Sequence, residues 1–270
     1  MTNPTEKIDL SGVRWGSVEW TLLVTLYLRA CESRLERPIL GDTAAAEAVD
    51  RIDYNWSRMR RWVPAWANQF MVALRAKKLD VWAADFLDHH PDAVVLHLGC
   101  GLDSRVFRLD PPATVQWFDV DQPAVIELRH QLYSDRDGYQ MIASSVTEPA
   151  WLDSIPADRP TLVVAEGLLM YLTEAEARQL LQRITDRFGS GELLTDLLSQ
   201  WGPRISKLIE WGTRDGRELA DWNPRLCYIE QTSAIADSEK IPLKPQRTVF
   251  RMLHAVPALR DYDRLYRYRY

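Results

Sequence analysis

Cysteine is scarce in this 270-residue sequence, and its spacing argues against two common kinds of cross-linked scaffold. Cys31, Cys100 and Cys227 lie far apart, with no CxxC pair and no Cys/His spacing typical of a zinc site. A disulfide framework normally needs an even and dense set of cysteines. We therefore expect reduced thiols, no bound metal and a cytoplasmic protein.

Long apolar runs are also missing. The stretch WTLLVTLYLRA, residues 20–30, is too short to span a bilayer, and charged residues follow it at once. The first twelve residues, MTNPTEKIDLSG, lack the basic start and apolar stretch of a secretory signal. Neither feature predicts a membrane partner, which agrees with the expected cytoplasmic location.

An excess of positive charge is absent as well. The 33 Lys and Arg residues are outnumbered by 38 Asp and Glu residues, for a formal net charge of -5. This balance gives no electrostatic support for a nucleic-acid partner. Repeats, low-complexity tracts and flexible linkers are not visible either. We expect residues 1–270 to form a single domain, as a monomer or a homodimer.

Helical periodicity dominates the first ninety residues. Apolar residues recur at helical spacing over residues 17–35, and Asp42 or Thr43 is suited to cap a following alanine-rich helix. Residues 56–88 are helical in pattern, with Pro64 as a kink or a new start. Residues 1–90 are therefore expected to form a helical N-terminal cap.

Beyond residue 90, short apolar runs alternate with helix-like segments. The clearest helix starts with a capping box, Thr173 and Glu176, and ends at Gly189. Strands that alternate with helices and are almost continuously apolar indicate a parallel sheet covered on both faces, so the fold class is α/β. The closing YRYRY, residues 266–270, alternates as an antiparallel strand with one solvent-facing side would. The predicted strands of the parallel sheet are residues 93–98, 114–121, 139–144, 161–166 and 192–198.

Two glycines stand at the carboxyl end of the first of these strands, in VVLHLGCGLDSRVFRL, residues 94–109. Ligands of open α/β sheets bind beyond such strand ends, and Gly99 and Gly101 would let the backbone approach one closely. A tight turn without a ligand would also use glycine. The third glycine of a dinucleotide fingerprint is replaced by Ser104, and the neighbouring Asp103 suits a cationic ligand better than a diphosphate.

An acidic residue ends the next strand. Asp121, in FDVDQP, follows Gly101 by twenty residues, where a carboxylate can accept both hydroxyls of an adenosine ribose. A ligand that contains adenosine, lacks a pyrophosphate and carries positive charge fits S-adenosyl-L-methionine. We expect this cofactor to bind within residues 91–200, with residues 201–270 on the substrate side.

Several motifs resemble those of the leucine carboxyl methyltransferase family, in particular its bacterial branch of tetracenomycin-type polyketide O-methyltransferases. They are LGCGLDSRVFRL (98–109), FDVDQPAVIELR (118–129), AEGLLMYL (165–172) and LRAKKLD (74–80). The resemblance covers roughly residues 18–200. It implies the Rossmann-like class I methyltransferase fold, with a mostly parallel seven-stranded sheet. It also implies methyl transfer to a carboxylate or a phenolic hydroxyl of a small polyketide-like or aromatic acceptor, the carboxylate being our first choice.

The same resemblance implies roles for individual residues. Gly99 and Gly101 would face the methionyl part of the cofactor, and Asp121 would bind the ribose. Arg75 would meet the cofactor carboxylate, and Glu166 would lie near its ammonium group. Without the resemblance, Arg75 could be a solvated helix residue and Glu166 could cap the next turn.

Tyr171 would lie at the mouth where the methyl group is transferred, although it could simply pack. The family often has Asp-Leu where this chain has Ser145 and Val146, which implies a weaker contact with adenine. His97 is expected to be a core residue and not a catalyst. The tryptophans of the substrate-side segment could line a pocket or pack in the core: Trp201, Trp211 and Trp222.

Two other functions fit a glycine turn in an α/β fold. One is a nicotinamide-dependent oxidoreductase, against which the missing third glycine and Asp103 count. The other is a non-catalytic binding module, which would have no physical reason to keep the whole set of expected cofactor contacts.

Overall fold

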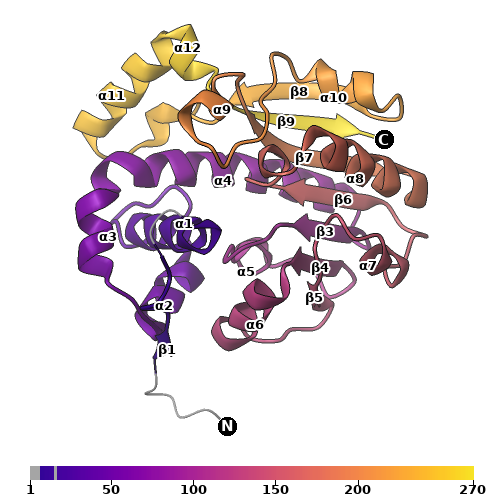
Figure 1. The fold of residues 1–270 in the computed structure, drawn as a ribbon, viewed down its shortest axis with the longest axis horizontal. Helices are drawn as coiled ribbons and strands as arrows, with labels where there is room; N and C mark the ends of the chain where they lie inside the picture. The colour runs from indigo at the N-terminus through magenta and orange to yellow at the C-terminus, as the bar shows by residue number, and fades with distance from the viewer. Residues whose placement is uncertain (1–6, 15–16) are drawn as a thin grey trace.

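The computed structural model describes residues 7–14 and 17–270, arranged around one seven-stranded sheet with helices on both faces (Figure 1). The sheet has the order β5-β4-β3-β6-β7-β9-β8. Its strands are β3 (Val94–Leu98), β4 (Gln116–Asp121), β5 (Tyr139–Ala143), β6 (Thr161–Ala165), β7 (Gly191–Leu198), β8 (Cys227–Ser233) and β9 (Asp263–Arg269). The helices from residue 91 on are α5 (Arg105–Leu109), α6 (Pro123–Leu132), α7 (Ala150–Asp153), α8 (Glu174–Arg187), α9 (Gly202–Ile205), α10 (Arg217–Trp222), α11 (Lys244–Ala255) and α12 (Pro257–Arg260).

The N-terminal helices agree with the predicted ones. They are α1 (Val18–Ser33), α2 (Thr43–Arg51), α3 (Trp56–Trp62) and α4 (Ala65–His89). The carboxylate of Asp42 caps α2 by accepting the Ala45 N–H at 3.0 Å, and Pro64 separates α3 from α4. The purely helical reading of this part was incomplete, because β1 (Ile8–Asp9) and β2 (Ile52–Asp53) form a short parallel ladder. Two residues are too few to show the alternation that identifies a strand.

The predicted parallel strands are confirmed, with ends that differ by at most two residues. β3 and β6 lie in the middle of the sheet, and every residue of both is buried. Burial on both faces explains why their sequences are almost continuously apolar and do not alternate. The capping box at Thr173 is also present at the start of α8.

The end of the chain forms the predicted antiparallel strand. β9 is antiparallel to β7 and lies between β7 and β8. Its arginine side is partly open to solvent, with Arg267 half-buried and Arg269 exposed. Tyr266 and Tyr268 are fully buried, and Arg267 pairs with Glu192 at 2.6 Å. β8 was not predicted, because its sequence CYIEQTS is polar enough to resemble a loop.

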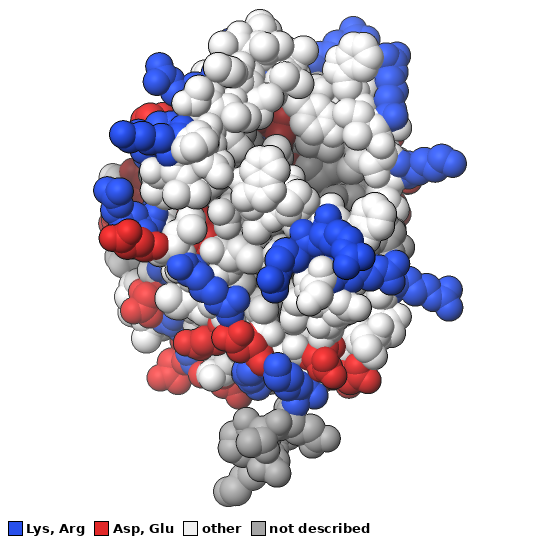
Figure 2. All heavy atoms as spheres, turned by 90° about the vertical axis from the view of Figure 1, so that its left-hand side faces the viewer, with Lys and Arg blue, Asp and Glu red and all other residues white. Residues whose placement is uncertain are grey.

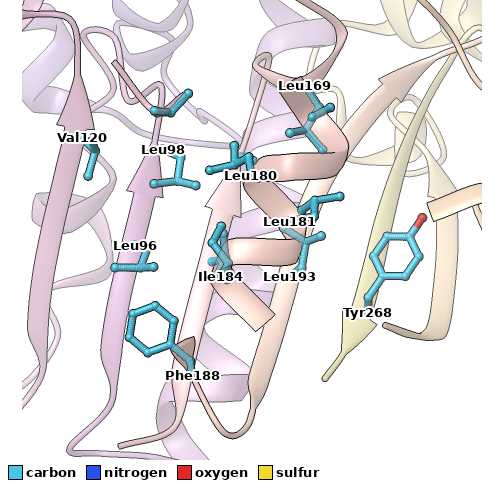
Figure 3. Close-up of a cluster of buried hydrophobic side chains, with 14 of the residues drawn as sticks. Leu96, Leu98, Val120, Leu169, Leu180, Leu181, Ile184, Phe188, Leu193 and Tyr268 are labelled. Carbon is cyan, nitrogen blue, oxygen red and sulfur yellow. The ribbon is translucent and has the colours of Figure 1, made fainter. Parts of the chain in front are cut away.

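Each face of the sheet is covered by a main helix. Helix α8 packs on one face, where its leucines and isoleucine belong to the same buried cluster as side chains of β3, β4, β7 and β9 (Figure 3). Helix α4 packs on the opposite face through Leu79, Trp82 and Phe86. Helix α4 contacts β6, β7 and β9. Arg75, in its first half, pairs with Glu166 just after β6 and with Asp196 of β7, so this half of the helix lies at the carboxyl edge of both strands. None of the helices described is long and apolar enough to cross a membrane.

Candidate active site

The strand order reverses between β3 and β6, and ligands of open α/β sheets bind beyond the carboxyl ends of the strands at such a point. We refer to this region as the crevice. Gly99 and Gly101 follow β3 with φ values of +58° and +51°, a left-handed conformation that favours glycine. A Cβ on Gly99 would lie 2.7 Å from the Leu168 side chain, and one on Gly101 would lie 2.9 Å from Leu22. The turn therefore brings the backbone close to the loop after β6 and to α1.

Asp121 ends β4 beside this turn. Its carboxylate accepts the Gly101 N–H and the Gln122 N–H, each at 2.7 Å, and no guanidinium is paired with it in the described part of the chain. Burial raises the pKa of Asp121, while these two hydrogen bonds act in the opposite direction. The carboxylate is partly exposed and retains lone pairs for a further donor.

Asp119, two residues earlier, has a different environment. It forms a buried ion pair with Arg129, and its Oδ1 lies 3.0 Å from Nδ1 of His97. The indole N–H of Trp117 donates to the same oxygen at 2.9 Å. Asp119 and His97 therefore belong to the core, which confirms the prediction for His97.

Arg75 reaches the same edge from α4 and is not a solvated helix residue. Its Nε donates to Oε1 of Glu166 at 3.0 Å, and its Nη1 donates to Oδ2 of Asp196 at 3.0 Å. Nη1 also lies 3.6 Å from Oδ2 of Asp263. The three carboxylates come from positions just after β6, within β7 and at the start of β9, which are neighbours in the sheet.

Glu166 is surrounded by guanidinium groups and does not cap the following turn. It pairs with Arg75, with Arg105 and, at 3.5 Å, with Arg29. Burial would raise the pKa of Glu166, but these three arginines outweigh it and lower the pKa to about 2. The carboxylate is therefore ionised at neutral pH.

Asp103 lies in a second group of charges, and the sequence-based interpretation of it was wrong. Its carboxylate is buried, 2.7 Å from Arg108, 3.3 Å from Arg29 and 3.5 Å from Arg105. Burial raises the pKa of Asp103, but the three guanidinium groups lower it well below its usual range. These arginines neutralise the charge that we expected to face a cationic ligand.

Two more carboxylates complete this group. Asp80 accepts from Arg105 at 2.7 Å and from Arg108 at 3.0 Å, and Asp42 lies 2.7 Å from Arg108. We call this set the Asp103 cluster: Asp42, Asp80, Asp103, Arg29, Arg105 and Arg108. It contains as many guanidinium groups as carboxylates.

The second set, the Arg75 cluster, consists of Arg75, Asp196 and Asp263. Asp196 also accepts the Gly167 N–H at 2.5 Å. Oδ1 of Asp263 is buried and has no hydrogen-bond partner among residues 7–14 and 17–270. Burial raises the pKa of both carboxyl groups, and for Asp263 the nearby Asp196 contributes to a pKa of about 7 despite Arg75.

Ser145 and Val146 follow β5 at the same edge. The hydroxyl of Ser145 lies 2.8 Å from that of Thr147 and accepts the Thr147 N–H at 3.3 Å. Val146 is buried, and its carbonyl accepts the indole N–H of Trp151 at 3.3 Å. Both residues therefore lie at the carboxyl edge of the sheet, and their contact with adenine stays a prediction.

Tyr171 belongs to a 3₁₀ turn, Leu169–Tyr171, that follows Glu166. Its side chain is 42% exposed, so it does not simply pack. Burial of the hydroxyl raises the pKa of Tyr171, and the charges of Arg75, Asp196 and Asp263 act on the hydroxyl as well. The hydroxyl of Tyr171 is therefore within electrostatic range of the Arg75 cluster, and its side chain is open to solvent.

The tryptophans of the substrate-side segment divide into two kinds. Trp211 and Trp222 pack against each other, with ring centroids 4.9 Å apart, and the Trp211 indole donates to carbonyls of the 3₁₀ turn region. They belong to the core and are not pocket walls. Trp201 is 57% exposed.

Sequence reasoning did not find the partners of Arg75 and Glu166. Two signals could have found them: Asp196 is a charge inside the apolar strand ELLTDLL, and Arg105 stands in the GLDSR motif. Asp263 and Arg29 carry no such signal, because each is one charged residue among many. Only the fold brings them to this edge.

A cleft of about 1540 Å³ lies apart from these charges, between the segment of β1 and helix α6. Leu22 and Leu102 contribute to its wall, whereas Asp121 and Glu166 do not. The charged crevice, and not this cleft, contains the residues singled out from the sequence.

Comparison with known proteins decides the family. The model of the leucine carboxyl methyltransferase family matches residues 22–185. The chain belongs to this family. It is 45% identical over 267 residues to the tetracenomycin polyketide synthesis O-methyltransferase TcmP of Streptomyces glaucescens, covering 95% of this chain and 98% of that protein.

A second relative is also a methyltransferase. The S-adenosyl-L-methionine-dependent methyltransferase dpfgK of Gibberella zeae is 33% identical, over 87% of this chain and 88% of that protein. The crystal structure of a Thermobifida fusca protein classed as a methyltransferase superposes with a TM-score of 0.59 at 15% identity, covering 92% and 94% of the two chains. The fold is thus the Rossmann-like class I methyltransferase fold. The protein is an S-adenosyl-L-methionine-dependent O-methyltransferase, and S-adenosyl-L-methionine is its cofactor.

Proposed function

We propose that the protein methylates an oxygen of a small polyketide-like or aromatic acceptor, and that this oxygen belongs to a carboxylate. The observation that carries the assignment of the site is the partly buried pairing of Arg75 with Glu166, next to the left-handed turn at Gly99 and Gly101. A zwitterionic amino-acid group needs a cation and an anion at fixed positions, and this pair supplies both.

The nucleoside half of the cofactor fits the other end of the crevice. Asp121 is partly exposed and lacks a cationic partner in the part of the chain that is described, so it can accept the ribose hydroxyls. The Ser145 hydroxyl and the Val146 backbone N–H are proposed to meet the adenine edge. The left-handed glycines leave the backbone of the β3 turn open to the methionyl chain.

Arg75 and Glu166 would hold the amino-acid half. Glu166 and Asp196 fix two of the nitrogens of Arg75, Nε and Nη1, whereas Nη2 lies beside Gly167. We assign Nη2 to the cofactor carboxylate. Glu166 accepts bonds from three guanidinium groups, and a carboxylate offers about four such positions, which leaves one for an ammonium group.

When bound, S-adenosyl-L-methionine supplies an activated methyl group for in-line displacement by the acceptor oxygen. The protein then has to hold that oxygen in line with the methyl carbon, and such positioning can lower a barrier by several kcal/mol. A carboxylate is already ionised at neutral pH and requires no general base. Tyr171, within electrostatic range of the Arg75 cluster, is proposed to orient it.

The surface supports an apolar acceptor. Figure 2 shows a broad uncharged area on the side of α3, α11 and α12, hollowed at one place where an acidic side chain is visible. Exposed apolar side chains from these helices include Trp62, Met252 and Leu259. The similarity to a polyketide O-methyltransferase agrees with such an acceptor. We further propose that the enzyme is one cytoplasmic domain, as a monomer or homodimer without a nucleic-acid partner.

Mass spectrometry of an acceptor panel tests this proposal. Purified enzyme is incubated with S-adenosyl-L-methionine and paired aromatic carboxylates and phenols, and products are searched for the gain of one methylene. We expect methyl esters with the wild type and with the surface variant Asp88→Ala, and a strong loss with Arg75→Leu. If only methyl ethers form, the acceptor oxygen is that of a phenol and not of a carboxylate. If no compound of the panel is methylated, the proposed acceptor class is wrong.

A further inference from the structure

The charges at the cofactor-binding edge do not balance. The Asp103 cluster, the Arg75 cluster and Glu166 together contain six carboxylates but only four guanidinium groups. All six carboxylates are buried. Uncompensated charge in a buried site is costly, so other positive charge or a bound proton is required.

The cofactor accounts for one of the two excess charges, since its sulfonium and ammonium groups exceed its single carboxylate by one. The other excess charge falls on the Arg75 cluster. There, one guanidinium serves both Asp196 and Asp263 and is also bound to Glu166. Asp196 has a second donor in the Gly167 N–H, whereas Oδ1 of Asp263 has none in the described chain.

Asp263 also has the right position to meet an acceptor. It begins β9 opposite Leu198, the last residue of β7, so it lies beyond Asp196 toward the outside of the crevice. The charge of Asp263 contributes to raising the pKa of both Tyr171 and Tyr262. Burial raises the pKa of both tyrosines, so both hydroxyls are neutral donors at physiological pH.

The charged and titratable groups around Asp263 come from every neighbouring element. They are Arg75 from α4, Glu166 after β6, Asp196 from β7, Tyr171 from the 3₁₀ turn, and Tyr262 and Tyr266 next to or within β9. Among these groups Arg75 is the cation, and it is already shared.

We propose that Asp263 is protonated at neutral pH and donates a hydrogen bond to the carboxylate of the methyl acceptor, beside Tyr171. This inference rests on the proposed carboxylate acceptor. Neutral O–H donors can hold a carboxylate without the strong charge neutralisation of a guanidinium, which would reduce its nucleophilicity. An ionised Asp263 would instead repel the acceptor. Asp263 is therefore a residue that determines acceptor specificity.

Proton uptake on binding tests this role without turnover. The probe is 2-naphthoate, titrated calorimetrically into enzyme saturated with S-adenosyl-L-homocysteine, in two buffers of different ionisation enthalpy at about pH 7.5. We expect the wild type and Asp88→Ala to take up protons on binding, and Asp263→Asn to take up none. Between about pH 6 and about pH 8, the wild-type affinity should fall roughly tenfold, because protonated Asp263 becomes scarce. The affinity of Asp263→Asn should change less than about twofold.

Several results would overturn the proposal. Equal proton uptake by Asp263→Asn would assign the proton to another group. Tighter binding at high pH, or binding of 2-naphthol but not 2-naphthoate, would make Asp263 a base for a phenol. If 2-naphthoate does not bind at either pH, Asp263 does not contact an acceptor carboxylate. Failure to bind S-adenosyl-L-homocysteine would instead contradict the cofactor site itself.

An infrared measurement keeps the test independent of the variant's folding. Wild-type enzyme should show a protonated carboxyl C=O band near neutral pH that disappears by about pH 8.5. Absence of this band in the wild type would overturn the proposal.

Discussion

The Asp103 cluster and the Arg75 cluster meet at Glu166, yet they are composed in opposite ways. In the Asp103 cluster three carboxylates face three guanidinium groups, and Asp103 alone has three cations within 3.5 Å. In the Arg75 cluster two carboxylates share one guanidinium, and an oxygen of Asp263 has no partner within the described chain.

This difference separates structural from functional charge. The balanced network neutralises its own charge, although Oδ2 of Asp103 accepts no hydrogen bond among the described residues, and it links α1, α4 and α5. An unbalanced one is completed only by a proton or a ligand. We therefore expect mutations in the first cluster to affect folding, and mutations in the second to affect binding and pH dependence.

The largest effect is expected from breaking the balanced cluster. Arg105 is fully buried and pairs with Asp80, Asp103 and Glu166, so Arg105→Leu leaves buried carboxylates without compensation. We expect a loss of about 3–5 kcal/mol in the free energy of unfolding, measured by urea denaturation. A loss below about 1 kcal/mol would show that the cluster is not structural.

A smaller effect, mainly on binding, is expected at Asp121. This carboxylate has no cationic partner among the described residues, so Asp121→Ala removes two hydrogen bonds from backbone N–H groups but leaves no buried ion unpaired. The variant should lower the unfolding free energy by less than Arg105→Leu does. Binding of sinefungin should weaken by about 1.5–3 kcal/mol in calorimetry, the range for hydrogen bonds to a charged group. The exposed Asp88→Ala serves as the control. An affinity equal to that of the wild type would remove the ribose assignment.

The pH dependence of stability should have opposite signs for two neighbouring carboxyl groups. The pKa of Asp263 is about 7 in the folded protein against 3.8 for the free group, so its stabilisation is present at low pH and is lost as the pH rises through about 7. The pKa of Glu166 is about 2 against 4.5, so its stabilisation is lost as the pH falls through that range.

Unfolding of Asp263→Asn across this range isolates the first group. Relative to the variant, the wild type should lose up to about 1.4 kcal/mol of unfolding free energy per pH unit between roughly pH 4 and 7. Parallel curves for the two proteins would mean that Asp263 is ionised throughout.

The smallest effect is expected from a surface pair. Arg34 lies 2.8 Å from Asp50, but the two side chains are 47% and 72% exposed. Arg34→Ala should change the unfolding free energy by less than about 1 kcal/mol, because water screens exposed pairs. A change as large as that of Arg105→Leu would mean that burial does not distinguish these ion pairs.

Local patterns were sufficient for most of the fold. Continuous apolar runs identified β3 and β6, and the capping box at Thr173 identified the start of α8. They failed for β8, whose polar sequence resembles a loop, and for β1 and β2, which are too short to show a period. Packing decided these three strands.

For the site, the sequence predicted the candidate cofactor contacts, but it did not predict which charged residues pair with them. The glycine turn, Asp121, Arg75 and Glu166 meet at one edge, as expected from strand ends and from the family resemblance. The prediction for Asp103 was wrong, because the sequence shows a carboxylate beside a turn but not the arginines that neutralise it. Trp211 and Trp222 were equally ambiguous between pocket and core.

The sequence by itself thus determined the α/β class, most element positions and the candidate cofactor contacts, because these depend on periodicity and on motifs short enough to read along the chain. Only the tertiary structure decided which carboxylates are neutralised. Arg29, Arg75 and Asp263 come from distant segments, and the charge of a buried carboxyl group depends on which of them the fold places within a few ångströms.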